Sequence, residues 1–188
     1  GDDFRTALAG DSKEFRESSS SLMFAFLLAI VLIYLILAAQ FESFKDPLVI
    51  MITVPLAITG ALIFMYFNDI TMNVFSQIGI IMLIGLVAKN GILIVEFANQ
   101  KQAAGEDKMQ AIHDASLQRL RPILMTSAAT ILGLIPMAFA SGEGCNQRIA
   151  MGITVVGGML VSTFLTMYIV PAVYSYVSTN RIKQQLKA

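Results

Sequence analysis

Charged residues are scarce in this chain of 188 residues. Asp, Glu, Lys and Arg together make up 14% of it, whereas soluble domains average about 25%. Hydrophobic residues make up 56%, and the mean hydropathy is +0.70. The 13 basic and 13 acidic residues cancel, so the chain has no basic excess that would bind a nucleic acid. The composition therefore predicts a membrane protein and excludes nucleic acid as a partner.

Cysteine and histidine are also nearly absent. Cys145 is the single cysteine, which excludes a disulfide within the chain and a zinc site built from cysteines. His113 is the single histidine, which excludes a metal site built from several histidines. We assign no role to Cys145 and expect His113 to be a structural residue. The composition therefore favours neither a metal nor a cofactor.

The N-terminal residues do not have the pattern of a signal peptide. No basic stretch precedes the first apolar run, and 21 mostly polar residues come before it. The chain also begins with glycine rather than methionine. We therefore expect it to be the end of a longer protein.

Five apolar segments are each long enough to cross about 30 Å of hydrocarbon at about 1.5 Å per residue. Only helices and closed barrels satisfy their backbone hydrogen bonds in lipid, and these segments are too long and evenly apolar for barrel strands. The predicted fold is an all-α membrane protein with five transmembrane helices. The expected spans are residues 22–39, 48–67, 72–97, 122–140 and 149–177.

Prolines and glycines inside the spans predict how these helices pack. Neighbouring groups can satisfy the carbonyls that Pro55, Pro136 and Pro171 leave free, so we expect all three to be tolerated. Small residues let helix backbones approach closely, so Gly60–Ala61 and Gly157–Gly158 are expected at helix contacts.

Basic residues in the connecting segments predict the orientation. Segments 40–47, 98–121 and 178–188 hold eight Lys and Arg, whereas segments 68–71 and 141–148 hold only Arg148. The positive-inside rule then puts the first group and the C-terminus in the cytoplasm, and the N-terminus on the opposite side.

Residues 99–118 are expected to form an interfacial helix in the cytoplasm. Apolar residues recur there at helical spacing, and Asp107, Asp114 and Gln118 fall on the opposite face. The apolar face consists of Met109, Ile112, Leu117 and Leu120.

Lys89 lies near the middle of the third span, where a charge costs about 2.5–3.5 kcal/mol. No Asp or Glu occurs at this depth in any of the five spans. We therefore predict that another part of the protein supplies the counter-charge. Thr126 of the antiparallel fourth span lies at similar depth. Carboxylates on a facing helix would form a proton relay with Lys89, and a static ion pair is the alternative.

Four sequence blocks resemble one transporter family. GLVAKNGILIVEFA at 85–98 and RLRPILMTSAATILGLIPMA at 119–138 are similar to resistance–nodulation–division (RND) efflux transporters. AAQFESFKDP at 38–47 and VPLAITGAL at 54–62 match the same family in the same order. The resemblance covers essentially the whole chain and is strongest to the hydrophobe/amphiphile multidrug branch, which is AcrB/MexB-like.

This resemblance implies that the chain contains the last five of twelve transmembrane helices. Residues 1–21 would be the exit and hinge from a periplasmic portion, 22–178 the transmembrane domain and 179–188 a cytoplasmic tail. Lys89, Asn90, Thr126 and Arg119 match the family's proton-relay positions. The relay aspartates belong to a helix that this chain lacks.

The resemblance also implies a partner set and an energy source. A transporter of this kind uses the proton-motive force without a cofactor, and it exports amphiphilic small molecules. It sits in the inner membrane of Gram-negative bacteria as a homotrimer, with a periplasmic adaptor and an outer-membrane channel. The family's porter and docking domains are absent here, so this piece alone should not transport.

Three alternatives remain at this point. A metal-exporting or protein-translocating relative is one, because the chain has 11 methionines, although these are scattered. An intramembrane serine hydrolase, with Lys89 and Ser127 as a dyad, is another. The third is a purely structural assembly subunit, which the cost of burying Lys89 disfavours.

Overall fold

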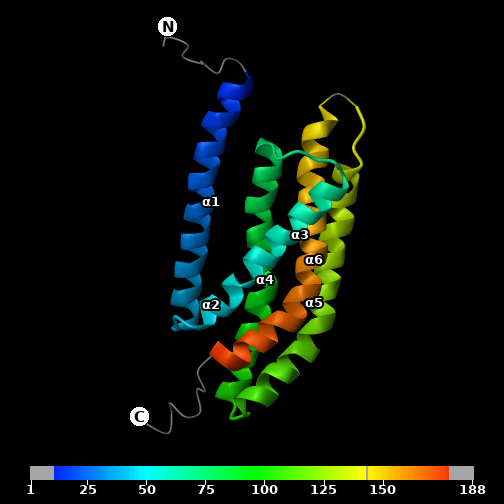
Figure 1. Ribbon diagram of the computed structural model, residues 1–188. Helices are drawn as coiled ribbons and strands as arrows, with labels where there is room; N and C mark the ends of the chain where they lie inside the picture. Colours follow the sequence, from blue (N-terminus) through cyan, green and yellow to red (C-terminus); the bar gives the residue numbers. More distant parts are fainter. Residues whose placement is uncertain (1–10, 143, 178–188) are drawn as a thin grey trace.

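The computed structural model describes residues 11–142 and 144–177, with side chains from Ser20 onward. Throughout these ranges the regular structure is helical, without strands (Figure 1). The helices are α1 (Asp11–Phe41), α2 (Asp46–Met51), α3 (Thr53–Phe67), α4 (Val74–Ala103), α5 (Lys108–Ala138) and α6 (Cys145–Val177).

Five stretches of the described helices are long and apolar enough to cross a membrane, which confirms the predicted all-α membrane protein. They are Ser20–Phe41, Asp46–Phe67, Val74–Ala103, Lys108–Ala138 and Cys145–Val177. Of the expected N-terminal segment, residues 11–21 begin α1. The expected C-terminal tail, 179–188, lies outside the described residues.

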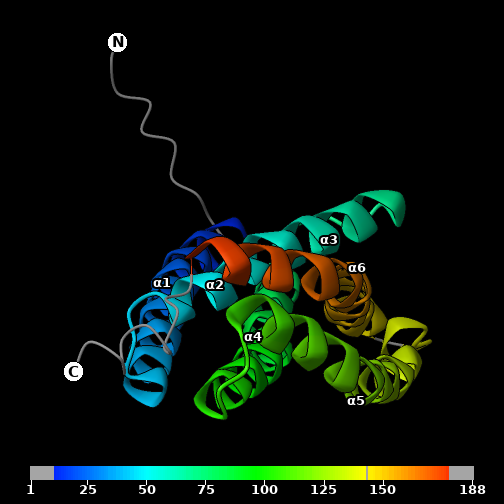
Figure 2. The ribbon, with the colours of Figure 1, turned by 90° about the horizontal axis from the view of Figure 1, so that it is seen from below.

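The five spans run alternately down and up in Figure 1, and α6 has the most extensive contacts with the other helices. Helices α3, α4 and α5 each pack extensively on α6, whereas the backbones of α3 and α5 do not lie next to each other. Helix α1 stands to one side and touches only α2 and α4 among the described helices (Figures 1 and 2). The turn between α4 and α5 marks the lower end of the bundle in Figure 1, which we call the α4–α5 end.

The second span is divided into α2 and α3 because of Pro55. Proline has no N–H to donate to the carbonyl four residues earlier, that of Met51, and its ring clashes with that carbonyl. Helix α2 accordingly ends at Met51, and α3 begins at Thr53. The Thr53 hydroxyl donates to the Ile50 carbonyl at 2.6 Å, so a side chain satisfies part of the interrupted backbone.

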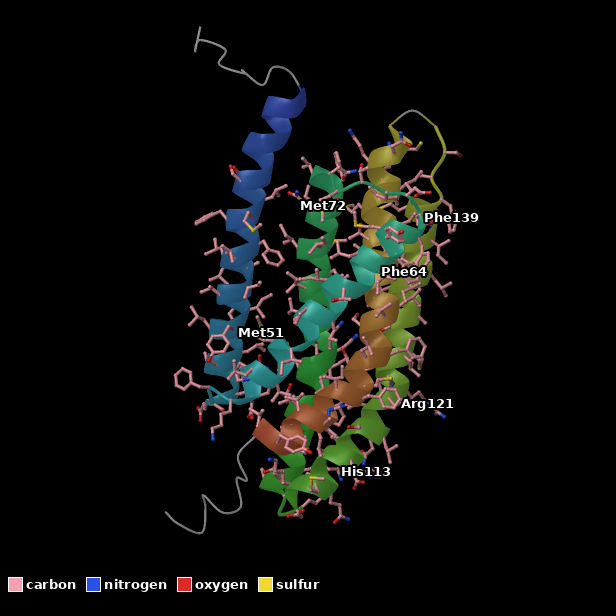
Figure 3. All side chains as sticks on the ribbon, in the orientation of Figure 1. Met51, Phe64, Met72, His113, Arg121 and Phe139 are labelled. Atoms are coloured by element: carbon pink, nitrogen blue, oxygen red, sulfur yellow. The ribbon has the colours of Figure 1, made fainter. Side chains whose placement is uncertain are left out.

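Glycines bring α6 into close contact with α3 and α4, and Gly60, Gly157 and Gly158 lie at helix contacts as expected. A Cβ atom at Gly157 would lie 2.2 Å from the Cβ of Phe64, which Figure 3 labels on α3. A Cβ at Gly158 would lie 2.2 Å from a methyl group of Leu83 on α4, and one at Gly60 would lie 2.6 Å from the Cβ of Val161. Normal carbon contacts are about 3.5–4.0 Å, so no side chain fits at these positions without movement.

The segment expected to form an interfacial helix, 99–118, is organised differently. A turn around Gly105, with φ of +97°, separates the end of α4 from α5, and Asp107 caps α5 by accepting from the Met109 N–H. Residues 108–118 are therefore the first part of the long helix α5. The expected apolar face is also divided, because Ile112 is buried whereas Met109 and Leu117 are each 60% exposed.

Candidate functional site: an intramembrane lysine on an open helix face

Lys89 lies on the outer surface of the described bundle. Its side chain is exposed, and no described residue forms a hydrogen bond or ion pair with it. It continues a row of exposed α4 residues at helical spacing, which consists of Ile78, Met82 and Gly85. A Cβ atom at Gly85 would have no described atom within 4 Å apart from the neighbouring backbone of α4 itself. A mid-span cation therefore faces a side of α4 that the described helices leave open.

Asn90, the next residue, points the opposite way, into the bundle. It is 3% exposed, and its Nδ2 donates to the Oγ of Ser127 on α5 at 3.3 Å. The hydroxyl of Thr163 on α6 donates to the same Oγ at 3.1 Å. We call Asn90, Ser127 and Thr163 the polar trio. It joins α4, α5 and α6 by side-chain hydrogen bonds.

The Asn90–Ser127 contact fixes where Lys89 and Thr126 lie. Each precedes a member of the contact by one residue, so both are at nearly the same depth. One residue corresponds to about 100° of rotation around a helix. Because α4 and α5 are antiparallel, these two rotations turn Lys89 and Thr126 toward the same side of the helix pair. Both residues are exposed, and the Thr126 hydroxyl donates to the Ile123 carbonyl at 3.1 Å.

Arg119 lies on the same face of α5 as Thr126, two turns nearer the α4–α5 end. Two turns correspond to about 10 Å. The guanidinium carbon is 4.6 Å from the centre of the Phe97 ring on α4, a cation–π contact. The Arg119 Nε is buried without a hydrogen-bond partner among the described residues. Glu96 is likewise two turns from Lys89 on α4, too far for an ion pair with it.

A second buried polar cluster lies at the α4–α5 end, and we call it the end cluster. Asp46 of α2 accepts from the Asn99 Nδ2 at 3.0 Å. The Tyr174 hydroxyl of α6 donates to the Asn99 Oδ1 at 2.5 Å and accepts from the Gln102 Nε2 at 2.9 Å. All four residues are at most 7% exposed. Sequence reasoning missed this cluster, because its members come from three different helices and no spacing along the chain indicates that they meet.

The geometry bears on the enzyme alternative. Ser127 is 2% exposed, and its hydrogen-bond partners are an amide and a hydroxyl, neither of which is a general base. Lys89 is on the outer side of α4, away from the polar trio. The arrangement therefore offers no Lys89–Ser127 dyad of the kind that activates a serine nucleophile.

A cavity of about 250 Å³ lies between α1, α3 and α4, away from Lys89. Its lining is apolar apart from Gln77. Within the described part of the chain, His, Cys, Asp and Glu form no group of three that could hold a metal ion. We therefore take Lys89 with Thr126 and Arg119 as the candidate functional site.

Comparisons with known proteins identify similar sequences. The sequence profile described as the AcrB/AcrD/AcrF family matches residues 2–178. The chain is 44% identical over 177 residues to an uncharacterized transporter of Haemophilus influenzae, covering 90% of this chain and 17% of that protein. It is 40% identical over 184 residues to the multidrug resistance protein MdtC of Yersinia pseudotuberculosis and of Yersinia pestis, covering 96% of this chain and 18% of those proteins. The chain thus spans less than a fifth of the length of these relatives.

Proposed function

Because this chain belongs to the AcrB/AcrD/AcrF family of RND transporters, we propose that it forms the C-terminal membrane part of a proton-driven multidrug efflux pump. In this proposal Lys89 and Thr126 are part of the proton pathway. Arg119 lies on the same face at the α4–α5 end, where protons leave or enter. The multidrug assignment is supported by the similarity to the MdtC proteins.

The observation that carries the proposal is the open face around Lys89. A mid-span ammonium that faces lipid is costly, so it needs an acidic partner, and no described residue supplies one. We place that partner on a helix from the remainder of the transporter, packed against the exposed rows of α4 and α5. When a carboxylate there takes up a proton, its attraction for Lys89 falls, and the helices can move relative to each other. Proton uptake is thereby linked to a conformational change.

The whole transporter is proposed to work in the inner membrane of a Gram-negative bacterium. The basic loops and the C-terminus face the cytoplasm in this arrangement, and the N-terminus faces the periplasm. We further propose a homotrimer that uses a periplasmic adaptor and an outer-membrane channel to export amphiphilic molecules. No cofactor takes part, because the proton-motive force drives the transport.

The test is efflux by the full-length transporter with Lys89 replaced. Lys89→Ala should abolish drug efflux while the protein still inserts and accumulates in the membrane. Thr126→Ala should reduce efflux less, since a hydroxyl orients a neighbour but carries no charge. Lys101→Ala is the matched control, because Lys101 lies on the same helix but at its end, paired with Glu106 at 2.7 Å. Normal drug resistance in cells with Lys89→Ala would refute the proton-pathway assignment.

The remaining alternatives make different predictions for the same protein. A metal exporter would protect cells against a metal salt rather than against amphiphilic drugs. A serine hydrolase would react covalently at Ser127 with a serine-directed probe. Protection against metals alone, or labelling of Ser127, would favour those alternatives over drug efflux.

A further inference from the structure

The polar trio is placed where it can determine how α4 is rotated relative to α5. Asn90 and Thr163 each lie within two residues of the middle of their helices, and all three members are at most 3% exposed. Ser127 accepts from both neighbours, and two acceptor sites are all that a hydroxyl offers. The trio therefore links three helices through one shared hydroxyl.

The neighbours of Asn90 and Ser127 on their own helices are largely apolar, and apolar contacts specify helix rotation only weakly. Val87 and Ile94 flank Asn90 on α4, and Ile123 flanks Ser127 on α5, all fully or almost fully buried. Aliphatic side chains of similar size can exchange places when a helix rotates, whereas a buried amide has favourable contacts only where it finds its partner. A single buried asparagine is known to fix helix register in this way.

The rotation of α4 decides where the ammonium of Lys89 points. With Asn90 bonded to Ser127, Lys89 is turned about 100° away from the α4–α5 contact, onto the same side as Thr126. If α4 were rotated by about 100° so that Lys89 took the place of Asn90, the ammonium would lie inside the α4–α5 contact, among apolar side chains. The Asn90–Ser127 hydrogen bond and the position of Lys89 are thus two consequences of one helix orientation.

We propose that Ser127 and Thr163 are positioning residues, which act through Asn90 to hold Lys89 and Thr126 together on the open face. This inference rests on the proposed function and adds a role to residues that are not themselves in the proton pathway. Thr163 acts indirectly, because its hydroxyl on α6 donates to the Ser127 hydroxyl, which in turn accepts from Asn90. The amide of Asn90 serves here to orient the helix and does not carry a proton.

The first experiment compares two threonines of α6 in the full-length transporter, reconstituted in proteoliposomes. Thr163→Val keeps the shape but removes the hydroxyl that reaches α5, whereas Thr163→Ser keeps the hydroxyl. Thr154→Val is the matched control, because Thr154 is also fully buried but donates to the Ala150 carbonyl of its own helix. Transport per folded molecule is measured against drug concentration, with ethidium as the substrate.

Thr163→Val should lower the maximal turnover at least about fivefold, because small displacements of reacting groups reduce rates strongly. The ethidium concentration at half-maximal rate should not change, because the trio is not a drug site. Thr163→Ser and Thr154→Val should behave like the unaltered protein. An unchanged turnover in Thr163→Val, or an equal loss in Thr154→Val, would overturn the inference. If Thr163→Val does not accumulate, Ser127→Ala carries the same test by removing the shared acceptor.

A second measurement is independent of transport and therefore separates this inference from the proposed function. Spin labels are attached at Lys89→Cys and Thr126→Cys, with Cys145→Ser and all other cysteines removed. Dipolar broadening should show one narrow distance distribution, which widens in Thr163→Val and stays narrow in Thr154→Val. Equal distributions in both variants would show that the trio does not position the two residues, whatever the effect of Lys89→Ala on efflux.

Discussion

Removing one hydroxyl from the end cluster should destabilise the protein measurably. Tyr174→Phe keeps the ring, which is fully buried, and deletes the oxygen that bonds both Asn99 and Gln102. Asn99 Oδ1 then loses a donor, and Gln102 Nε2 loses an acceptor. A net hydrogen bond contributes about 0.5–1.5 kcal/mol, and a buried polar group left without a partner costs about 1–3 kcal/mol. We therefore expect a loss of about 2–4 kcal/mol from the free energy of unfolding.

The assay is the thermal unfolding midpoint of the full-length transporter in detergent. Tyr176→Phe is the matched control, because it makes the same chemical change two residues away on a side chain that is 90% exposed. It should leave stability within about 0.5 kcal/mol. Gln102→Leu added to Tyr174→Phe should cost less than the sum of the two single changes, since both partners are then apolar. Equal midpoints for Tyr174→Phe and Tyr176→Phe would refute the reasoning.

Three further changes test other parts of the structure. Gly157→Ala should lower the unfolding midpoint, because overpacking against Phe64 costs about 1–3 kcal/mol. The better helix propensity of alanine offsets at most about 1 kcal/mol of this cost. A higher midpoint would contradict the close packing of α6. Lys101→Ala should leave the unfolding midpoint nearly unchanged, because solvent screens its partly exposed ion pairs. A clear drop in the midpoint would show that these ion pairs contribute to stability. Cys145 should react with a membrane-impermeant maleimide in intact cells, and labelling only after lysis would reverse the proposed orientation.

The spanning helices could be predicted from the sequence because hydrophobic length alone identifies them. Close helix contacts at Gly60 and Gly157 were predictable, because small residues let helix backbones approach in a membrane, but the sequence did not tell that α6 and α3 are the partners. The similar depth of Lys89 and Thr126 followed from counting residues along antiparallel helices. The contact between Asn90 and Ser127 agrees with that estimate.

What the sequence could not give was the rotation of each helix. The third span has apolar residues on every side. The sequence pattern therefore did not indicate whether Lys89 lies on the buried or on the exposed face of its helix. The partners of Asn90 and Tyr174 come from other helices, and counting depth along a span does not tell which side chains meet across a helix contact. The division of 99–118 at Gly105 was missed for a related reason. The apolar pattern of 109–120 predicted a separate surface helix, but these residues form the first part of α5, which continues through Pro122.

The central place of α6 has a consequence for biogenesis. This helix follows α3, α4 and α5 in the chain, yet each of them packs extensively on it, and the backbones of α3 and α5 do not lie next to each other. During synthesis the earlier helices therefore enter the bilayer before the surface that unites them exists. A chain that stops before Cys145 would keep the contacts of α4 with α3 and α5 but would lack the helix on which all three pack.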